Sequence, residues 1–462
     1  MDNMITEMKM TKIKTLLTAM YTVAFMTTAS CAEDISNIQP TQPNMAVSDA
    51  NVNSYIHPRS RYVDYTPTYT FSSEPWQRVN VDAYREKLIS VYGRPRIQGV
   101  IRHDSPPPKR MLRECDSEFH NYNLLKNIRI NGSGLLNDPK TTAQLHCVMN
   151  LREYMHNEVI LNGRDSEILN YFYTDLIPSW IANDAFNASG MRTTQLENTD
   201  AGYAFLINTI ARLYTGYGNY WGTTPEMDQG FRAWWDRRSY DDNAKIYSDG
   251  WEKCTEIEVG PPPPRSPRPQ ARGECQNVAA DYAAALAYMA LYYNDSDMLN
   301  ESLFVAGKVA RTSSAEGAPF DAFTGYLAIG YMQMTASALD ETAMVLSDAG
   351  INLYNMSFAN HGATVNDIII FAGREYMNPV EVFKYACPTN NPNAHDCRDQ
   401  DYSVPSRDRI WAASNSLRSM AGALYQHAEM RAVMAVVNPG GHRNEIHAQD
   451  FVFNKYILAK YF

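Results

Sequence analysis

Basic runs and long apolar runs are both absent from this 462-residue chain. Only 20% of its residues are charged, and 41 Lys and Arg stand against 51 Asp and Glu, for a formal net charge of −10. A nucleic-acid-binding protein needs a basic patch or stripe, so we expect no nucleic-acid partner. No apolar run beyond the N-terminal region reaches the ~18 residues of a membrane span, so we expect no transmembrane segment.

Several motifs of common enzyme classes are also absent. The chain has no Gly-x-Ser-x-Gly elbow, no phosphate-binding loop, no dinucleotide glycine fingerprint and no His-Glu-x-x-His zinc helix. It has no Cys-x-x-Cys pair and no His at ligand spacing from its cysteines. We therefore expect neither a cofactor nor a metal.

The composition is that of a large folded protein. Hydrophobic residues make up 45% of the chain, which is enough for a sizeable core and excludes a disordered protein. The 30 Tyr and 7 Trp suit a sugar-binding cleft, although the same rings also fill cores.

Residues 1–32 are interpreted as a signal peptide. Three lysines between positions 9 and 14 precede a short apolar stretch at 16–26, and small residues at 28–32 suit a signal peptidase. Cys31 also fits a lipid-modified cysteine, which would make the protein a lipoprotein. We expect export to the periplasm or the extracellular space.

The six remaining cysteines are interpreted as disulfide partners because exported proteins meet oxidising conditions. Six cysteines allow fifteen connectivities, and the sequence does not select one. Pairing of nearest neighbours is attractive, because Cys254–Cys275 would close a proline-rich loop and Cys387–Cys397 a polar one.

Past the signal peptide the chain divides into two parts. Residues 33–110 are rich in Pro, Ser, Asn and Tyr and predict a loose N-terminal arm, ordered only from about Trp76. Residues 111–462 show apolar residues at three- and four-residue steps, which predict helices. The expected helices are 143–161, 165–186, 199–214, 227–240, 277–293, 298–311, 325–349 and 410–437, and 450–458 is a candidate strand.

Several of these helices are apolar on much of their surface, above all the Ala-rich helix that begins near Asn277. A helix without a clear polar face is buried among other helices. No fixed repeat of 30 to 50 residues is found. The fold class we expect is all-α, an incomplete α/α toroid preceded by the loose arm.

One stretch, residues 316–354, resembles a known family. It has an acidic-Gly loop, then Pro319-Phe320-Asp321, then Gly325, then Tyr331 six residues later, and a long helix that ends in Gly-Ile-Asn-Leu-Tyr. This order is similar to that of the family-5-type alginate lyases, which are incomplete α/α toroids. Looser similarity covers about residue 115 to the C-terminus.

The resemblance implies cleavage of a polyuronate by β-elimination. Tyr331 falls on the family's catalytic Tyr, which removes the C5 proton and protonates the leaving oxygen. Asn277 matches the Asn that helps to neutralise the uronate carboxylate, and it also fits a helix N-cap. Such electrostatic stabilisation of developing charge is a large catalytic term.

The chain departs from the family at two catalytic positions. Val278 stands at the His position and Thr324 at the Arg position. Either other cations replace them, or elimination chemistry is lost. The candidate replacements are Lys308, Arg311, Arg232, His361 and His442.

Four residues are expected to bind substrate. Tyr220 and Trp221 lie in a Gly-punctuated stretch, 215–222, interpreted as a loop whose exposed rings stack on sugars or fold back as a lid. Arg232 and His361 are the candidate cations. The expected partner is thus an acidic polysaccharide, and the oligomeric state is not predicted.

Two other functions compete with a polyuronate lyase. A glycoside hydrolase on the same toroid would need two carboxylates, for which Asp281, Asp321 and Asp228 are available. A non-catalytic polysaccharide-binding protein is favoured by Val278 and Thr324.

Overall fold

The computed structural model describes residues 80–94, 139–186, 193–238, 275–323, 328–358 and 362–377. Every regular element in these ranges is helical, and the only β-type contact described there is an isolated bridge between Ser357 and Thr364. The all-α class is therefore confirmed for this part of the chain. The expected helix 410–437, the candidate strand 450–458 and the signal peptide lie outside the described residues.

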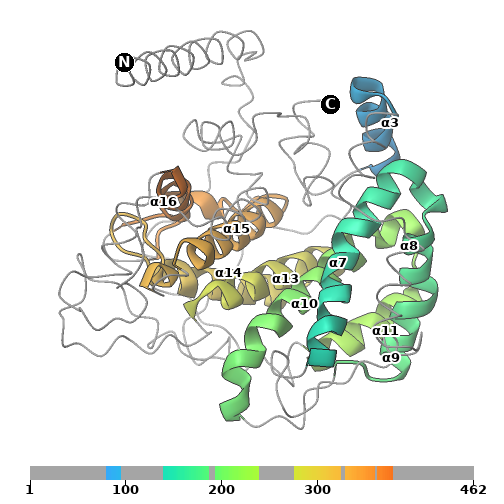
Figure 1. Cartoon of the computed structure of the whole chain (residues 1–462), viewed down its shortest axis with the longest axis horizontal. Helices are drawn as coiled ribbons and strands as arrows, with labels where there is room; N and C mark the ends of the chain where they lie inside the picture. Colours follow the sequence, from blue (N-terminus) through green and yellow to red (C-terminus); the bar gives the residue numbers. More distant parts are fainter. Residues whose placement is uncertain are drawn as a thin grey trace, which may run out of the picture. The chain divides into compact units, whose positions relative to one another are not determined.

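Figure 1 shows the helices that the structure describes. In chain order they are α3 (Val81–Tyr92), α7 (Pro139–Asn162), α8 (Glu167–Tyr171), α9 (Ile177–Ala182), α10 (Thr193–Trp221), α11 (Pro225–Asp236), α13 (Asn277–Tyr293), α14 (Ser296–Arg311), α15 (Ala328–Ser347) and α16 (Val365–Met377). A π-helical stretch, η3 (Phe172–Leu176), joins α8 to α9, and a short 3₁₀ helix, η7 (Phe320–Phe323), precedes α15.

Three long helices, α10, α13 and α15, run in the same direction. On α10 and α13, Asn208 bonds Asp281 and, further along both helices, the rings of Tyr214 and Tyr292 meet. On α13 and α15, Asn277 contacts Met334 near the start, and Tyr288 donates to Glu341 further along. The N-terminal ends of α13 and α15 are therefore neighbours.

The helix α14, which follows α13 and precedes α15 in the sequence, runs in the opposite direction to both. Its Ser302 donates to the carbonyl of Ala283 at 2.7 Å, and Thr312 lies 3.5 Å from the carbonyl of Cys275. Parallel helices packed on one another, with returning helices between them in sequence, are the arrangement expected of an α/α toroid. Figure 1 shows α13 between α10 and α15.

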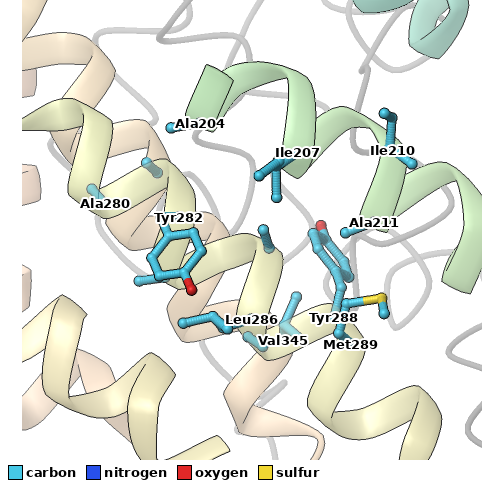
Figure 2. Close-up of a cluster of buried hydrophobic side chains, with 14 of the residues drawn as sticks. Ala204, Ile207, Ile210, Ala211, Ala280, Tyr282, Leu286, Tyr288, Met289 and Val345 are labelled. Atoms are coloured by element: carbon cyan, nitrogen blue, oxygen red, sulfur yellow. The ribbon is translucent and has the colours of Figure 1, made fainter. Parts of the chain in front are cut away.

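The helix α13 is the centre of the core. All of its residues from Asn277 to Tyr292 are buried, as its all-round apolar sequence predicts. Small alanines let the neighbouring helices approach closely, while larger side chains fill the spaces between them. Figure 2 shows this packing between α10 and α13, with Tyr282 and Leu286 projecting from α13 and Ile207 from α10. The helix ends at Tyr293, and its C-cap residue Asn294 adopts the left-handed conformation with φ of 53°.

Most of the stretch 215–222, which was predicted as a loop, is helical instead, and only Gly222 lies in a turn. The helical part forms the last turns of α10, which ends at Trp221 rather than near Tyr214. Gly218, one of the glycines that suggested a loop, serves close packing, because a Cβ atom there would lie 2.6 Å from the hydroxyl of Tyr292. The predicted loop was wrong because a helix can carry glycine where another helix crosses it.

Two described cysteines, Cys147 and Cys275, are buried and disulfide-bonded. Cys115, Cys254, Cys387 and Cys397 lie outside the described residues, so the connectivity stays a prediction. Within the described part of the chain, no helix has both the length and the apolar character to cross a membrane.

Candidate functional site

The start of α13 is capped by a residue distant in sequence. Gln276 is the N-cap residue, but its side chain makes no capping hydrogen bond. Instead, the carboxylate of Asp321, from η7, accepts the backbone N–H of Asn277 at 3.0 Å. A carboxylate is favoured at this positive end of a helix. The expectation that Asn277 itself caps the helix was wrong, because Asn277 is the first helical residue.

The same carboxylate also holds α15. The hydroxyl of Thr335 donates to Oδ2 of Asp321, the atom that accepts the Asn277 N–H. The Thr335 hydroxyl also lies 3.2 Å from the carbonyl oxygen of Tyr331, one turn earlier on α15. Asp321 is 1% exposed, and burial raises its pKa to about 7 against the lowering effect of its two hydrogen bonds.

Asn277 and Tyr331 lie near the neighbouring N-terminal ends of α13 and α15. The side-chain amide of Asn277 contacts the sulfur of Met334 at 3.9 Å. Met334 and Tyr331 are three residues apart on α15 and so share a face, separated by about 4.5 Å along the axis. Asn277 is largely buried, whereas Tyr331 is half-buried and reaches solvent. The fold thus brings the first turn of α13 beside the early turns of α15, which carry Tyr331, 54 positions from Asn277 in the sequence.

Deeper between the same helices lies a second group, here called the polar cluster: Asn208, Arg212, Asp281, Tyr288 and Glu341. The Asn208 amide donates to Asp281 at 2.9 Å and lies 3.4 Å from Glu341. Glu341 also accepts from the Arg212 guanidinium at 2.9 Å and from the Tyr288 hydroxyl at 2.7 Å. Every member is buried, so the cluster couples α10, α13 and α15 through strong hydrogen bonds.

The two carboxylates of the polar cluster have opposite pKa shifts. Burial raises the pKa of Asp281 to about 8, so this group holds its proton at neutral pH. Burial acts in the same direction on Glu341 and is the largest single influence, but the Arg212 and Arg152 guanidiniums and the hydrogen bonds from Tyr288 and Asn208 together outweigh it and bring the pKa of Glu341 below its ordinary value. One carboxyl is thus protonated beside one that is ionised, a pairing typical of acid–base sites.

The polar cluster begins one turn beyond the Asn277–Tyr331 pair. Asp281 follows Asn277 by four residues, about 6 Å along α13, and both lie on the same face of that helix. Glu341 follows Tyr331 by ten residues, about 15 Å along α15. The two groups therefore occupy successive levels between α13 and α15.

The predicted sugar-stacking residues Tyr220 and Trp221 lie at the C-terminal end of α10, away from the polar cluster. They follow Asn208 by twelve and thirteen residues, about 18 Å along the helix. Tyr220 is only 3% exposed and donates to Asp82 at 2.8 Å, so the expectation of an exposed ring was wrong for this residue. Trp221 is half-buried, stacks on Tyr173 and donates to Asn170.

Arg232 is held far from the Asn277–Tyr331 pair. Its guanidinium bonds Asp236 on α11 and Asp295, the N-cap of α14, and lies over the ring of Tyr293. Asp295 follows the C-terminal end of α13, about 25 Å from Asn277 along that helix. The structure does not bring Arg232 together with Tyr331.

Two of the other candidate cations, Lys308 and Arg311, lie on the last turn of α14. Because Thr312 packs beside Cys275, this turn is next to the start of α13. Lys308 is completely buried and lies 5.9 Å from the centre of the Phe304 ring. His361, His442 and Thr324 lie outside the described residues.

The third candidate acid, Asp228, is engaged at the C-terminal end of α13. Its carboxylate accepts from the hydroxyls of Tyr214 at 2.7 Å and Tyr292 at 3.1 Å, and Tyr293 donates to its carbonyl oxygen. This arrangement links α10, α11 and α13. Val278, at the position expected for His, is buried in the core cluster. Within the described ranges, no three His, Cys, Asp or Glu side chains gather as a metal site would require.

The sequence did not single out Asn208, Arg212, Tyr288 or Glu341. A signal for two of them was present, because Arg212 and Glu341 each interrupt an apolar helix. A charged residue on a buried face needs a partner of opposite charge. Which partner it finds depends on how the helices pack.

Comparison with known proteins gives the following. No family model matches the chain, and no curated protein matches it. Among solved structures, the chain is similar to alginate lyase A1-III from Sphingomonas species A1, with 12% identity and a TM-score of 0.48 over 77% of this chain and 89% of that one. It is also similar to an alginate lyase from Bacteroides ovatus, with 11% identity and a TM-score of 0.42 over 83% of this chain and 100% of that one.

Proposed function

We propose that the protein is an exported polysaccharide lyase that cleaves a polyuronate, alginate-like polysaccharide by β-elimination. The observation that carries the proposal is that the N-terminal ends of α13 and α15, on which Asn277 and Tyr331 stand, are neighbours. In this proposal residues 111–462 form the lyase-like domain, which follows a signal peptide at 1–32 and an arm at 33–110. The location is periplasmic or extracellular.

Each of the two residues has a defined role in the reaction. The Asn277 amide donates a hydrogen bond to the uronate carboxylate, which makes the C5 proton more acidic. Ionised Tyr331 takes that proton, the C5 electron pair forms the C4=C5 double bond, and the bond from C4 to the glycosidic oxygen breaks. Tyr331 then gives the proton to the leaving oxygen, so the base and the acid are the same group.

A cation is still needed for the carboxylate, because Val278 and Thr324 replace the expected His and Arg. Arg311 on the last turn of α14 is favoured, since that turn lies beside the start of α13 and Arg311 is only half-buried, whereas Lys308 is completely buried. His361 remains a candidate from the sequence. Arg232, Tyr220 and Trp221 are better assigned to packing, because they lie at the far ends of α13 and α10.

The test is ultraviolet absorbance after mixing the mature protein separately with polymannuronate, polyguluronate and glucuronan. Elimination leaves a conjugated double bond that absorbs, and hydrolysis does not. We expect a rise with one polymer that is lost in Tyr331→Phe. Tyr293→Phe is the matched control, because its hydroxyl bonds Asp228 at the other end of α13. A rise that persists in Tyr331→Phe would contradict the assignment.

A glycoside hydrolase is the second candidate, favoured by the opposite pKa shifts of Asp281 and Glu341. In this case new reducing ends would appear without ultraviolet absorbance. They would be lost in Glu341→Gln and retained in Tyr331→Phe. Binding of a polysaccharide with no new ends would instead support a non-catalytic binding protein.

A further inference from the structure

Asp321 holds the two helices that carry the proposed catalytic residues, and it does so through a single oxygen atom. Its Oδ2 accepts the first N–H of α13, from Asn277, and the hydroxyl of Thr335 on α15. The carboxylate is 1% exposed, so water does not compete for these bonds. A carboxylate bonded to a helix N-terminus and to a hydroxyl in a dry site forms strong, directional bonds.

The connection reaches Tyr331 through Thr335. The Thr335 hydroxyl lies 3.2 Å from the Tyr331 carbonyl oxygen, so it contacts the turn from which the Tyr331 side chain projects. The same hydroxyl has the Asp321 carboxylate on its other side. The chain of contacts from Asn277 to Tyr331 therefore passes through Asp321 and Thr335.

We propose that Asp321 is a positioning residue, which through Thr335 sets the separation of Asn277 and Tyr331 and so determines how both meet one sugar unit. This inference rests on the proposed lyase function for its catalytic consequence. Its structural part, the coupling of α13 to α15, does not depend on that function. Displacement of a catalytic group by about 1 Å costs about a hundredfold in rate.

The position of Asp321 also changes how the substrate carboxylate is expected to bind. A helix N-terminus is a ready-made anion site, and α13 begins at Asn277. Asp321 already occupies that position. In our proposal the uronate carboxylate therefore meets the side chain of Asn277 and not the backbone N–H groups of α13.

The experiment compares two Thr→Val variants of α15. Thr335 and Thr342 are both completely buried, and each hydroxyl contacts the carbonyl oxygen four residues earlier. Only the Thr335 hydroxyl is described as also bonding Asp321. Thr342→Val is therefore the matched control for Thr335→Val, and Thr335→Ser, which keeps the hydroxyl, is the rescue variant.

Two measurements are made on the full mature chain. With the polyuronate that gives elimination, we expect kcat to fall about tenfold or more in Thr335→Val and Asp321→Asn, with KM changed less than about twofold, because the groups touching the substrate remain. Thr342→Val and Thr335→Ser should keep the wild-type kcat. Equal kcat values for Thr335→Val and Thr342→Val would overturn the catalytic part.

The second measurement is amide hydrogen exchange of the peptide that contains Asn277, which needs no substrate. We expect faster exchange in Thr335→Val and Asp321→Asn than in Thr342→Val, because the cap of α13 is weakened. Unchanged exchange would overturn the coupling of the helices. Faster exchange in a protein that cleaves none of the three polymers would support the coupling and refute the lyase function, so the two failures are distinguishable.

Discussion

Replacing Asp281 by asparagine should make the protein's stability less dependent on pH. Burial raises the pKa of Asp281 from 3.8 to about 8, so the folded protein holds a proton that the unfolded chain releases above about pH 4. Between these values the unfolded state binds fewer protons, so the free energy of unfolding falls as the pH rises. The asparagine side chain would carry no such proton, and its carbonyl oxygen would still accept the bond from Asn208.

The size of the pH effect on stability follows from the pKa shift of Asp281. Each pH unit between the two pKa values lowers the free energy of unfolding by about 1.4 kcal/mol for this one group. From about pH 5 to about pH 7, the wild type should therefore lose about 3 kcal/mol relative to Asp281→Asn. The pKa of Asp321 is also raised, so Asp321 lowers the free energy of unfolding with rising pH in the wild type and in Asp281→Asn alike. Its contribution therefore cancels when the two proteins are compared.

The assay is urea unfolding followed by circular dichroism at several pH values across this range. Asp165→Asn is the control, because Asp165 is exposed and its replacement should leave the pH dependence of the wild type intact. A constant difference in stability between wild type and Asp281→Asn at all pH values would refute the reasoning.

Three further predictions concern backbone fit, a buried ion pair and the carboxylate contact. Gly317→Ala should destabilise the protein by about 2 kcal/mol or more in urea unfolding, because Gly317 has φ of 89° and a Cβ atom there would strike the backbone of Asp367. The control is Gly230→Ala, inside α11 with space for a methyl group, which should be neutral or stabilising. Arg212→Met should cost about 3–5 kcal/mol by leaving the Glu341 carboxylate unpaired in the core, and thermal unfolding should show a lowered Tm. Asn277→Asp should raise KM for a polyuronate about tenfold or more by placing a negative charge beside the substrate carboxylate, whereas an unchanged KM would argue against that contact.

The helices that the sequence predicted best are those whose packing requires a regular pattern of apolar residues along the chain. The Ala-rich helix was predicted with its observed bounds, Asn277–Tyr293, because almost every residue faces other helices. The end of α10 was missed because glycines are typical of turns, and the packing of Gly218 against Tyr292 is visible only with the neighbouring helix in place. The helix predicted for 165–186 ends at Ala182, where Asp184 and Phe186 adopt positive φ.

The candidate site likewise contains residues that could be predicted from the sequence and residues whose roles depend on how the helices pack. Tyr331 and Asn277 were named from the resemblance to a known family, whose motifs depend only on the order of residues along the chain. The role of Asp321 depends on a contact across 44 residues, and that of Glu341 on a contact with Arg212 across 129 residues. Contacts over such separations are determined by the packing of whole helices. Sequence reasoning could identify Asp321 as an available acid, but it could not tell a cap from a catalytic group.

The most direct test of the central claim is the mass of the product ends after incubation with a polyuronate. Elimination by Tyr331 gives a new non-reducing end that is lighter by one water molecule than the end left by hydrolysis. We predict the lighter, unsaturated end with the wild-type protein and none with Tyr331→Phe. Product ends that retain the water would contradict the account and favour hydrolysis by the Asp281–Glu341 pair. Polymers that remain intact would contradict any role in cleaving them.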